Sequence, residues 1–485
     1  MNIFLVNKDS AVPLYLQIYD HMRQEILQGN LLPGTKLPPS RQLAKQCGVA
    51  RLTVTEAYAQ LKAEGFITSR SGSGTYVSDS LPIHSRVLPK HKMDATHPPL
   101  SAWGNRVMGM RQRVERPVPQ RPSIDFGFGR AFHHIFPYDV WRKLLARYLS
   151  TDDAMLARYG SVAGFYPLRE ALAHYLGRLR GVDCQPEQVV IVSGAQQALD
   201  ILARLLLEPG DEVLLETPGY MDAFAIFNVY GTQIESLPVD DEGFPVEKIP
   251  TTSRAKLLFV TPSNQFPSGG TMPLARRMAL LQWAQKHRAI IIEDDYDGEL
   301  RYDGRPLSAL QGLDKDGRVI YLGTFSKVLF PALRLGYVVL PHSLVTPFVQ
   351  AKRLVDRGAP TLTQAAISDF INEGHFERHL RHLRTAYGQR HAVLMKALQS
   401  HMPKSVHYST TPAGLHVMLF LPMGVEETAV IQQAAQAGVG VYPGARYHLQ
   451  HPAPPSILMG FSGLSEVDIE EGVRRLAKVL QNGGK

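Results

Sequence analysis

Apolar side chains recur at helical spacing through residues 10–65 and predict three helices. The first helix is expected over residues 13–28, where the apolar stripe consists of Leu16, Tyr19, Met22, Ile26 and Leu27. After a loop rich in proline and glycine, Ser40 is expected to cap a short second helix that ends at Gly48. The third helix follows over residues 51–65, and the next residues, FITSRSGSGTYV, have the pattern of strand, glycine turn and strand. Together these elements predict a winged helix-turn-helix of α+β class over residues 10–80.

From residue 123 to residue 485 the pattern changes to short β-branched runs that alternate with amphipathic helices. The run VVIVSG, for example, precedes the helical pattern of AQQALDILARLLLEPG, and the runs DEVLLETPGY and AKLLFVTPSN continue the alternation. Repeated strand–helix units predict an α/β domain on a large, mainly parallel sheet. Such a sheet binds its ligands at the carboxyl ends of the strands.

Residues 81–122 separate these two patterns. They contain seven prolines and show little periodicity, which is typical of an extended linker. This segment has 8 Lys or Arg against 2 Asp or Glu, residues 1–80 have 8 against 6, and residues 123–485 have 36 of each. The asymmetry predicts nucleic acid as the partner of the N-terminal part and a small ligand for the remainder. Five linker arginines are either solvated or bound to DNA phosphates: Arg106, Arg111, Arg113, Arg116 and Arg121.

Two buried β-branched runs, over residues 289–292 and 319–322, end abruptly at polar side chains. The first run is followed by Asp294 and Tyr296, and the second by Thr324, Ser326, Lys327 and Arg334. A lysine can form a Schiff base with an aldehyde, hydroxyls and an arginine can hold a phosphate, and a carboxylate can pair with a ring nitrogen. This order of side chains predicts a site for pyridoxal 5'-phosphate (PLP) with Lys327 as its covalent anchor. On chemistry alone, Asp295 and Asp297 remain alternatives to Asp294.

Three further loops lie at the ends of expected strands. The turn that leads into Ala195 and Gln196 can cradle a phosphate, because backbone N–H groups and the positive end of a helix dipole point towards it. Tyr220, in ETPGY, can lie flat on a pyridine ring or belong to the core. Asn264, in TPSNQFPSG, can donate a hydrogen bond to the phenolic oxygen of PLP or serve as a turn residue.

Composition argues against several classes of protein. No stretch approaches the run of about 18 apolar residues that a membrane span requires. The N-terminus also lacks the basic start and long apolar core of a signal peptide. Cys47 and Cys184 lie far apart without metal-ligand spacing, so neither a disulfide framework nor a metal site is expected. A cytoplasmic protein with no membrane partner is therefore predicted.

Residues 123–485 resemble the fold type I PLP-dependent aminotransferases, through SGAQ, ETPGY, TPSN, EDDYDG and TFSK followed by arginine. The resemblance implies that Lys327 forms the Schiff base, that Asp294 keeps the pyridine nitrogen protonated and that Tyr220 stacks on the ring. It implies that Tyr296 and Asn264 meet the ring oxygen. The phosphate would be bound by Ala195, Gln196, Thr324, Ser326, Arg334 and, across a dimer, Tyr159. The chain from about residue 350 onward matches the small domain of that fold.

Aminotransferases of this class usually bind the substrate carboxylate with an arginine in an Arg-Leu pattern near the C-terminus. The corresponding stretch, SILMGFSGL, has no arginine, and Arg446 in VYPGARYH is the expected substitute for binding an effector. An efficient enzyme must orient its substrate beyond forming a Schiff base. The missing arginine therefore favours a domain that senses ligands.

The N-terminal part resembles the GntR family of winged-helix repressors, in LPPSRQLAKQCGVARLTV and in the closing GSGTYV. The resemblance implies Arg41 and Arg51 on phosphates or guanine edges and Thr53 in the major groove. Arginine suits both tasks, because its planar fork can hold phosphate oxygens or O6 and N7 of guanine. Gly72 and Gly74 would let the backbone of the wing approach the minor groove.

With both resemblances in this order along one chain, the protein is similar to the MocR subfamily of GntR-type bacterial transcription regulators. This implies a homodimer, arranged head to tail with each DNA-binding domain crossing to its partner, on double-stranded DNA with paired half-sites. The effector would be PLP itself, or an amine or amino acid that displaces Lys327 as an external aldimine and shifts how the winged helices sit. An aminotransferase with a DNA-binding appendage, capable of slow transamination, is the alternative.

Overall fold

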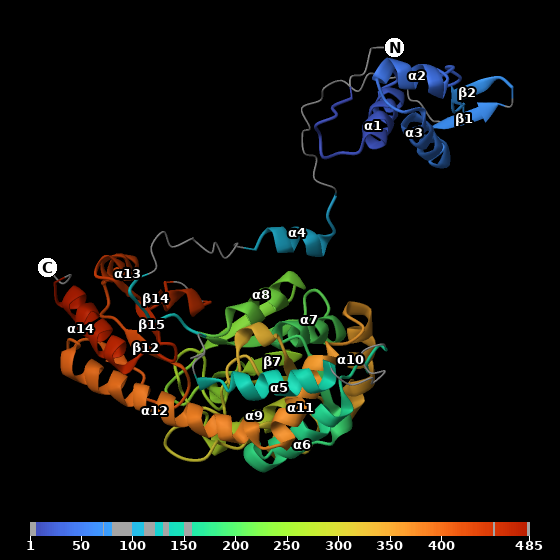
Figure 1. Ribbon diagram of the computed structural model, residues 1–485. Helices are drawn as coiled ribbons and strands as arrows, with labels where there is room; N and C mark the ends of the chain where they lie inside the picture. The colour runs from blue at the N-terminus through green and yellow to red at the C-terminus, as the bar shows by residue number, and fades with distance from the viewer. Residues whose placement is uncertain are drawn as a thin grey trace. The chain divides into compact units, whose positions relative to one another are not determined.

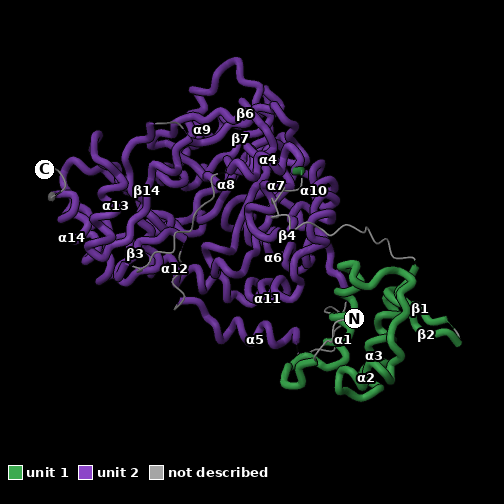
Figure 2. Tube along the Cα trace, turned by 90° about the horizontal axis from the view of Figure 1, so that it is seen from above, with its two compact units in different colours: residues 1–99 green, residues 100–485 purple. Residues whose placement is uncertain are grey.

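The computed structural model describes residues 6–70, 72–79, 99–110, 122–129, 135–149, 158–449 and 452–482. The chain divides into two compact units, residues 1–99 and residues 100–485 (Figure 2). The first unit is built around an apolar cluster of its own, and the second contains the large sheet (Figure 1). The two kinds of sequence pattern therefore correspond to separate bodies.

The first unit has the helices and the hairpin of a winged helix-turn-helix. Its elements are α1 (Leu14–Leu27), α2 (Ser40–Cys47), α3 (Arg51–Ala63), β1 (Ile67–Arg70) and β2 (Gly74–Val77). The two strands are antiparallel, and the helices pack through Ile18, Met22, Val54 and Leu61, none more than 1% exposed. The structure confirms the predicted order of elements.

Two details of the first unit differ from the prediction. Leu27 is 59% exposed, because it lies about 100° round the helix from the buried Ile26. Ser40 is the first helical residue of α2 and makes no capping hydrogen bond; the N-cap position is Pro39. The hydroxyl oxygen of Ser40 instead accepts a hydrogen bond from Nε of Arg51, at 3.3 Å.

A short helix, α4 (Ala102–Met108), interrupts the segment that the sequence predicts to be extended. It belongs to the second unit and packs on α8 (Met221–Val229). Nε of Arg106 donates a hydrogen bond to the carbonyl of Val229 at 2.6 Å, and the ring of Trp103 lies 6.5 Å from that of Tyr230. Arg106 thus binds protein rather than a phosphate, and the other four linker arginines lie outside the described residues. A helix of this length is too short to show periodicity and depends on tertiary contacts for its stability.

The second unit is built on a seven-stranded sheet with the order β4-β10-β9-β8-β7-β5-β6. The strands are β4 (Val189–Val192), β5 (Glu212–Thr217), β6 (Gln233–Pro238), β7 (Leu257–Val260), β8 (Ile290–Asp295), β9 (Val319–Thr324) and β10 (Gly336–Val339). Only β10 runs antiparallel to its neighbours, so the predicted mainly parallel sheet is confirmed. Asp294 pairs with Leu322, which brings the ends of β8 and β9 side by side.

Helices cover both faces of this sheet (Figure 1). The helices α7 (Ala195–Leu206), α8 and α10 (His342–Val355) share one apolar core with it. On the other face lie α6 (Tyr166–Arg180) and α9 (Leu274–His287), and α5 (Tyr138–Leu149) and α11 (Thr361–Asn372) pack beyond α6. Where both faces of a strand are buried, as in β4 and β7, the strand appears in the sequence as an uninterrupted apolar run.

The C-terminal part forms a smaller domain, drawn in orange and red in Figure 1. Its antiparallel sheet has the order β11-β12-β15-β14, with β11 (His407–Tyr408), β12 (His416–Phe420), β14 (Tyr442–Pro443) and β15 (Ser456–Gly460). The helices are α12 (His375–His401), α13 (Glu427–Gln436) and α14 (Glu466–Asn482). A parallel pair of β3 (Ile124–Asp125) and β13 (Val439–Gly440) ties residues 122–129 to this domain. Phe128, four residues past the start of β3, is thereby held near the large sheet.

Among the described residues, none of the helices combines the length and the apolar character that crossing a membrane requires. The same residues contain no group of three or more His, Cys, Asp or Glu side chains that could hold a metal ion. Cys47 and Cys184 are free thiols.

Candidate functional site

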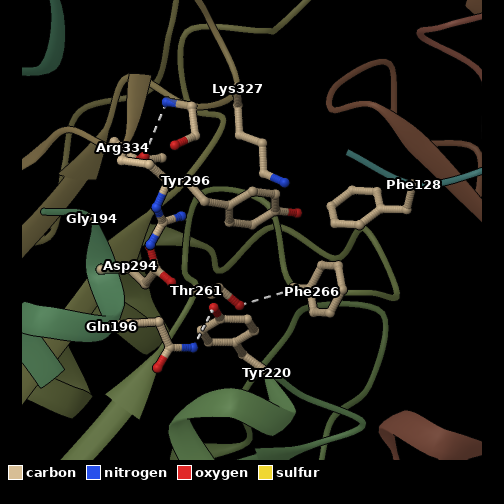
Figure 3. A pocket seen from close by; sticks show the side chains of 13 residues that line it. Phe128, Gly194, Gln196, Tyr220, Thr261, Phe266, Asp294, Tyr296, Lys327 and Arg334 are labelled. Carbon is tan, nitrogen blue, oxygen red and sulfur yellow. Dashed lines mark hydrogen bonds between the residues drawn. The ribbon is translucent and has the colours of Figure 1, made fainter. Parts of the chain in front are cut away.

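A cavity of about 160 Å³ opens where the carboxyl ends of the parallel strands meet the loops that follow them (Figure 3). Loops after β4, β5 and β7, the end of β8 and the segment after β9 all contribute to it. Its lining comprises Phe128, Gly194, Ala195, Gln196, Tyr220, Thr261, Phe266, Asp294, Tyr296, Thr324, Ser326, Lys327 and Arg334. Nine of the eleven residues proposed for the cofactor from the sequence therefore lie around one space.

One side of the cavity is suited to a phosphate. The first turn of α7 begins at Ala195 and presents unpaired backbone N–H groups, as any helix N-terminus does. Gly194 before it has φ of 91°, and a Cβ there would lie 3.4 Å from Nη2 of Arg334. The exposed guanidinium of Arg334 donates a weak hydrogen bond, 3.4 Å long, to the carbonyl of Ser193. A helix N-terminus and an arginine thus face the same corner, where Figure 3 shows Gly194, Gln196 and Arg334 together.

Lys327 extends into the cavity from the segment that follows β9 (Figure 3). Burial lowers the pKa of its ammonium group, while Asp297 and Asp294 oppose that shift. Its Nζ atom lies 4.3 Å from the centre of the Phe128 ring, a cation–π contact. A lysine with a lowered pKa supplies the neutral amine that nucleophilic attack on an aldehyde requires.

The three candidate carboxylates have different surroundings in the structure. Asp294 lines the cavity, and burial raises its pKa to about 7, with Asp295 adding to the shift. Asp295 points the other way and is bound by Arg180 at 2.7 Å and by the Tyr321 hydroxyl at 2.5 Å. Asp297 accepts a hydrogen bond from Nδ2 of Asn264 at 2.8 Å. Asp294 is therefore the carboxylate placed to meet a ligand in the cavity.

Asn264 lies just behind the cavity wall. Its Nδ2 donates to the Tyr296 hydroxyl at 3.1 Å as well as to Asp297, whereas its buried Oδ1 has no hydrogen-bond partner among the described residues. A buried polar atom without a partner is costly. Tyr220 accepts a hydrogen bond from Nε2 of Gln196 at 3.1 Å, and its ring stacks on Phe259. These contacts hold the Tyr220 ring along one wall of the cavity (Figure 3).

Two residues proposed from the sequence lie apart from the cavity in this chain. Tyr159 is 88% exposed. Arg446 is exposed as well; it contacts the hydroxyl of Tyr447 and lies over that ring at 4.7 Å. Conversely, Phe128, Thr261 and Phe266 line the cavity but were not predicted as site residues. Thr261 and Phe266 lie in the TPSNQFPSG loop that follows β7, so this motif could have indicated them, whereas Phe128 is brought to the cavity by contacts between distant segments.

The residues proposed for DNA lie on the surface of the first unit. Arg41, in the first turn of α2, and Arg51, at the start of α3, are exposed, and Thr53 is half-buried. Gly72 and Gly74 are exposed in the hairpin turn with φ of 73° and 119°, which favours glycine at both positions. Two basic side chains that were not predicted also lie at the wing: Arg70 is the last residue of β1, and Lys36, in the loop between α1 and α2, forms a β-bridge with Tyr76 of β2. Lys36 and Arg70 both pack over the ring of Tyr76, at 5.7 Å and 4.7 Å.

Comparison with known families agrees with both units. Residues 127–476 match the family of aminotransferase class I and II, and residues 14–77 match the bacterial regulatory proteins of the gntR family. The probable rhizopine catabolism regulatory protein MocR of Rhizobium meliloti is 38% identical over 98% of this chain and 95% of that protein. The chain belongs to the MocR subfamily of GntR-type regulators. A second member, the HTH-type transcriptional regulator TauR of Rhodobacter capsulatus, is 31% identical over 94% of each chain.

Solved aminotransferases share the fold of the second unit of this MocR-type chain. LysN, an α-aminoadipate aminotransferase of Thermus thermophilus solved with N-(5'-phosphopyridoxyl)-L-leucine, aligns with a TM-score of 0.72 and 30% identity. The alignment covers 79% of this chain and 97% of LysN. The kynurenine aminotransferase of Pyrococcus horikoshii, solved with PMP, aligns with a TM-score of 0.71 and 32% identity over 76% of this chain and 92% of that one. The predicted fold type I architecture is confirmed.

The residues around the cavity fit PLP as the cofactor. The N-terminus of α7 and Arg334 can bind a phosphate, and the buried Asp294 can pair with a pyridinium nitrogen. Tyr296, whose hydroxyl accepts a hydrogen bond from Nδ2 of Asn264, lines the same cavity. When bound, PLP supplies an aldehyde that condenses with a primary amine. Lys327 is the amine that this chain places in the cavity.

The Asp294 carboxyl makes the stability of the cofactor-free chain depend on pH. Because burial raises its pKa from 3.8 to about 7, the folded chain keeps a proton that the unfolded chain loses between these values. Stability contributed by this group therefore falls as pH rises from about 4 to about 7 and is constant above that range. The amide that Asp294→Asn introduces does not ionise, so this variant avoids the cost of a buried charge. We expect it to raise the free energy of unfolding of the cofactor-free chain at pH 8, by about 1 to 3 kcal/mol, and to lower PLP affinity.

Thermal melting of the cofactor-free protein at pH 5 and pH 8 measures the first effect, and PLP titration measures the second. Asp139→Asn is the matched control, because that carboxylate is 84% exposed and paired only at the surface with Arg142. If Asp294→Asn destabilised the cofactor-free chain at pH 8, Asp294 would have to be a structural charge with partners in the folded protein.

Proposed function

We propose that this regulator senses an amine through the PLP in its cavity and converts that signal into altered DNA binding. The observation that carries the proposal is the meeting of Lys327, Asp294 and Arg334 around one cavity in a chain that also contains a winged helix. Curated relatives that span almost the whole chain are transcription regulators. Some of their names refer to rhizopine catabolism and others to pyridoxine biosynthesis, so the effector does not carry over from them.

Each part of the cofactor is proposed to contact its own set of residues. Arg334, Thr324, Ser326 and the N–H groups at Ala195 and Gln196 hold the phosphate, while Asp294 keeps the ring nitrogen protonated. Tyr220 covers the ring, and Tyr296 with Asn264 binds the ring oxygen. With PLP bound, Lys327 would supply the amine that holds its aldehyde, and an effector amine would compete with Lys327 for that position.

The regulator is proposed to act as a head-to-tail homodimer on an operator with paired half-sites on the bacterial nucleoid. Two copies of α3 would enter successive major grooves, as helix-turn-helix dimers do. Tyr159 supports this arrangement, because a tyrosine that is 88% exposed in one chain is free to meet the phosphate in the partner's cavity. Binding of the effector shifts DNA binding only if the two ligand states favour different arrangements of the dimer.

The visible absorption of the purified full-length protein tests this function. PLP bound to Lys327 gives a band that free PLP lacks, and an effector amine shifts that band while changing affinity for the DNA fragment upstream of the protein's own gene. Rapid conversion of the band to that of the aminated cofactor, with repeated turnover, would support the aminotransferase instead. Absence of any band after PLP is added would contradict the proposal.

Removal of Arg51 is expected to weaken operator binding. If Arg51 contacts a base edge, Arg51→Ala lowers affinity by about 1 to 3 kcal/mol and relaxes sequence preference; if it contacts a phosphate, the salt dependence becomes shallower by about one unit of slope. Fluorescence anisotropy with labelled DNA at several salt concentrations distinguishes the two. Lys62→Ala is the control, because Lys62 is an exposed cation at the far end of the same helix. Equal losses in both variants would argue against α3 as the reading helix.

A further inference from the structure

The cavity has two chemically different sides. Among the described residues, the cations that line it are Lys327 and Arg334, and Arg334 stands at the corner assigned to the phosphate. On the opposite side of Lys327, two aromatic rings face the cavity: Phe128 and Phe266, whose centres are 5.2 Å apart (Figure 3). An effector that reacts at the position of Nζ of Lys327 must place its substituent against these rings, because Nζ itself lies 4.3 Å from the centre of Phe128.

The side chains behind these two rings are also uncharged. Phe266 packs edge-on against Tyr447 at 5.1 Å and belongs to one buried cluster with Leu458. Leu458 lies in the SILMGFSGL stretch and is 0% exposed, so an apolar side chain fills this wall. His416 lies 4.8 Å from Phe128 and 5.3 Å from Phe266.

His416 does not supply the missing positive charge. Its Nε2 donates to the carbonyl of Pro267 at 3.1 Å, which leaves Nδ1 as the unprotonated nitrogen, and Nδ1 has no partner among the described residues. Burial lowers the pKa of His416 to about 4, so the ring is neutral at pH 7. The exposed Arg446 stacks on the ring of Tyr447, outside the set of residues that line the cavity.

A carboxylate on the effector would therefore enter a space walled by Phe128 and Phe266. A charged group that leaves water without a cation or a sufficient set of hydrogen bonds loses more than it regains. Aromatic faces carry a negative quadrupole and repel an anion placed over them, whereas they favour apolar groups and cations.

We propose that the effector of this regulator is a primary amine without a carboxylate, whose uncharged substituent packs between Phe128 and Phe266. This inference rests on the proposed function, because it concerns the amine that exchanges with Lys327. It deepens that function by excluding ordinary amino acids as preferred effectors. Selectivity then arises from apolar contact with the two rings, beside which the described part of the chain provides no carboxylate-binding arginine.

Two compounds that share one side chain test this directly. 2-Phenylethylamine and L-phenylalanine differ only in the carboxylate, and each is titrated into the PLP-loaded full-length protein while the visible absorption band is followed. We expect the amine to shift the band at a concentration at least about tenfold lower than the amino acid does. Equal or tighter binding of L-phenylalanine, or no shift with either compound, would overturn the proposal.

Two variants locate the selectivity. Phe266→Leu is expected to weaken the response to 2-phenylethylamine several-fold while the band of the PLP-loaded protein persists, which shows that the fold and cofactor site survive. Arg446→Gln is expected to leave both titrations unchanged. If Arg446→Gln removed a response to L-phenylalanine, Arg446 would be the carboxylate anchor and the inferred effector class would be wrong. Loss of the PLP band in the unmodified protein would refute the proposed function itself, before any amine is added.

Discussion

Lys327→Ala is expected to abolish the visible absorption band of bound PLP completely. Lys327 is the lysine that lines the cavity, and its lowered pKa makes its amine available for condensation with the aldehyde. Without Lys327, PLP is held non-covalently by its phosphate and ring contacts alone, and we expect dialysis to remove it. The measurement is the absorption spectrum of the variant after PLP loading and dialysis, with the winged helix monitored by its DNA affinity in the absence of effector.

Lys256→Ala is a suitable control for Lys327→Ala. Lys256 is also a lysine of the second unit, but it is an exposed partner of Asp211 at 2.8 Å. Its replacement should leave the PLP spectrum unchanged. An unaltered band in the Lys327 variant would mean that another amine anchors the cofactor and that the assignment of the site is wrong.

Arg180→Met is expected to cause the largest loss of stability among single substitutions near the cavity. Arg180 is 0% exposed and pairs with Asp295 at 2.7 Å; it also donates to the hydroxyl of Ser263 at 2.9 Å and to the carbonyl of Leu307. Removing one partner of a buried ion pair leaves the other charge uncompensated, which costs about 3 to 5 kcal/mol. Gly298 lies so close to this pair that any side chain there would clash with it.

Urea denaturation of the cofactor-free protein measures the change in the free energy of unfolding. Arg204→Met is the matched control, since Arg204 pairs with Asp200 at 2.9 Å on the surface of α7, where a salt bridge is worth at most about 1 kcal/mol. Because Asp295 adjoins Asp294, the Arg180 variant should also bind PLP less tightly. A loss no greater than that of the control would show that the buried pair is replaceable by apolar packing.

Residues that follow directly on a strand could be assigned from the sequence. Lys327 and Arg334 follow the apolar run of β9, and the cavity forms at the end of that strand. Ala195 and Gln196 were assigned because a helix starts immediately after β4. In each case local chain geometry decides where the side chain lies, and a pattern of a few residues records that geometry.

Contacts between distant segments could not be assigned in this way. Phe128 reaches the cavity because β3 pairs with β13, more than three hundred residues further along the chain. Phe266 lies in a loop whose path depends on the smaller domain packed against it, as the hydrogen bond between His416 and Pro267 shows. The helix α4 was missed for the same reason, since its contacts with α8 stabilise it.

From the residue pattern we could predict the two-part organisation, the winged helix, the mainly parallel sheet and the position of Lys327 after a strand. Those features depend on hydrophobic period and on strand ends, which are local properties of the chain. On chemistry alone three nearby carboxylates remained open, the aminotransferase resemblance pointed to Asp294, and the tertiary structure shows that Asp294 lines the cavity. Successive side chains of a strand point to opposite faces, so Asp294 enters the cavity while Asp295 turns to Arg180 at the end of α6. Which face is which depends on the helices that cover the sheet, and no stretch of local sequence contains that information.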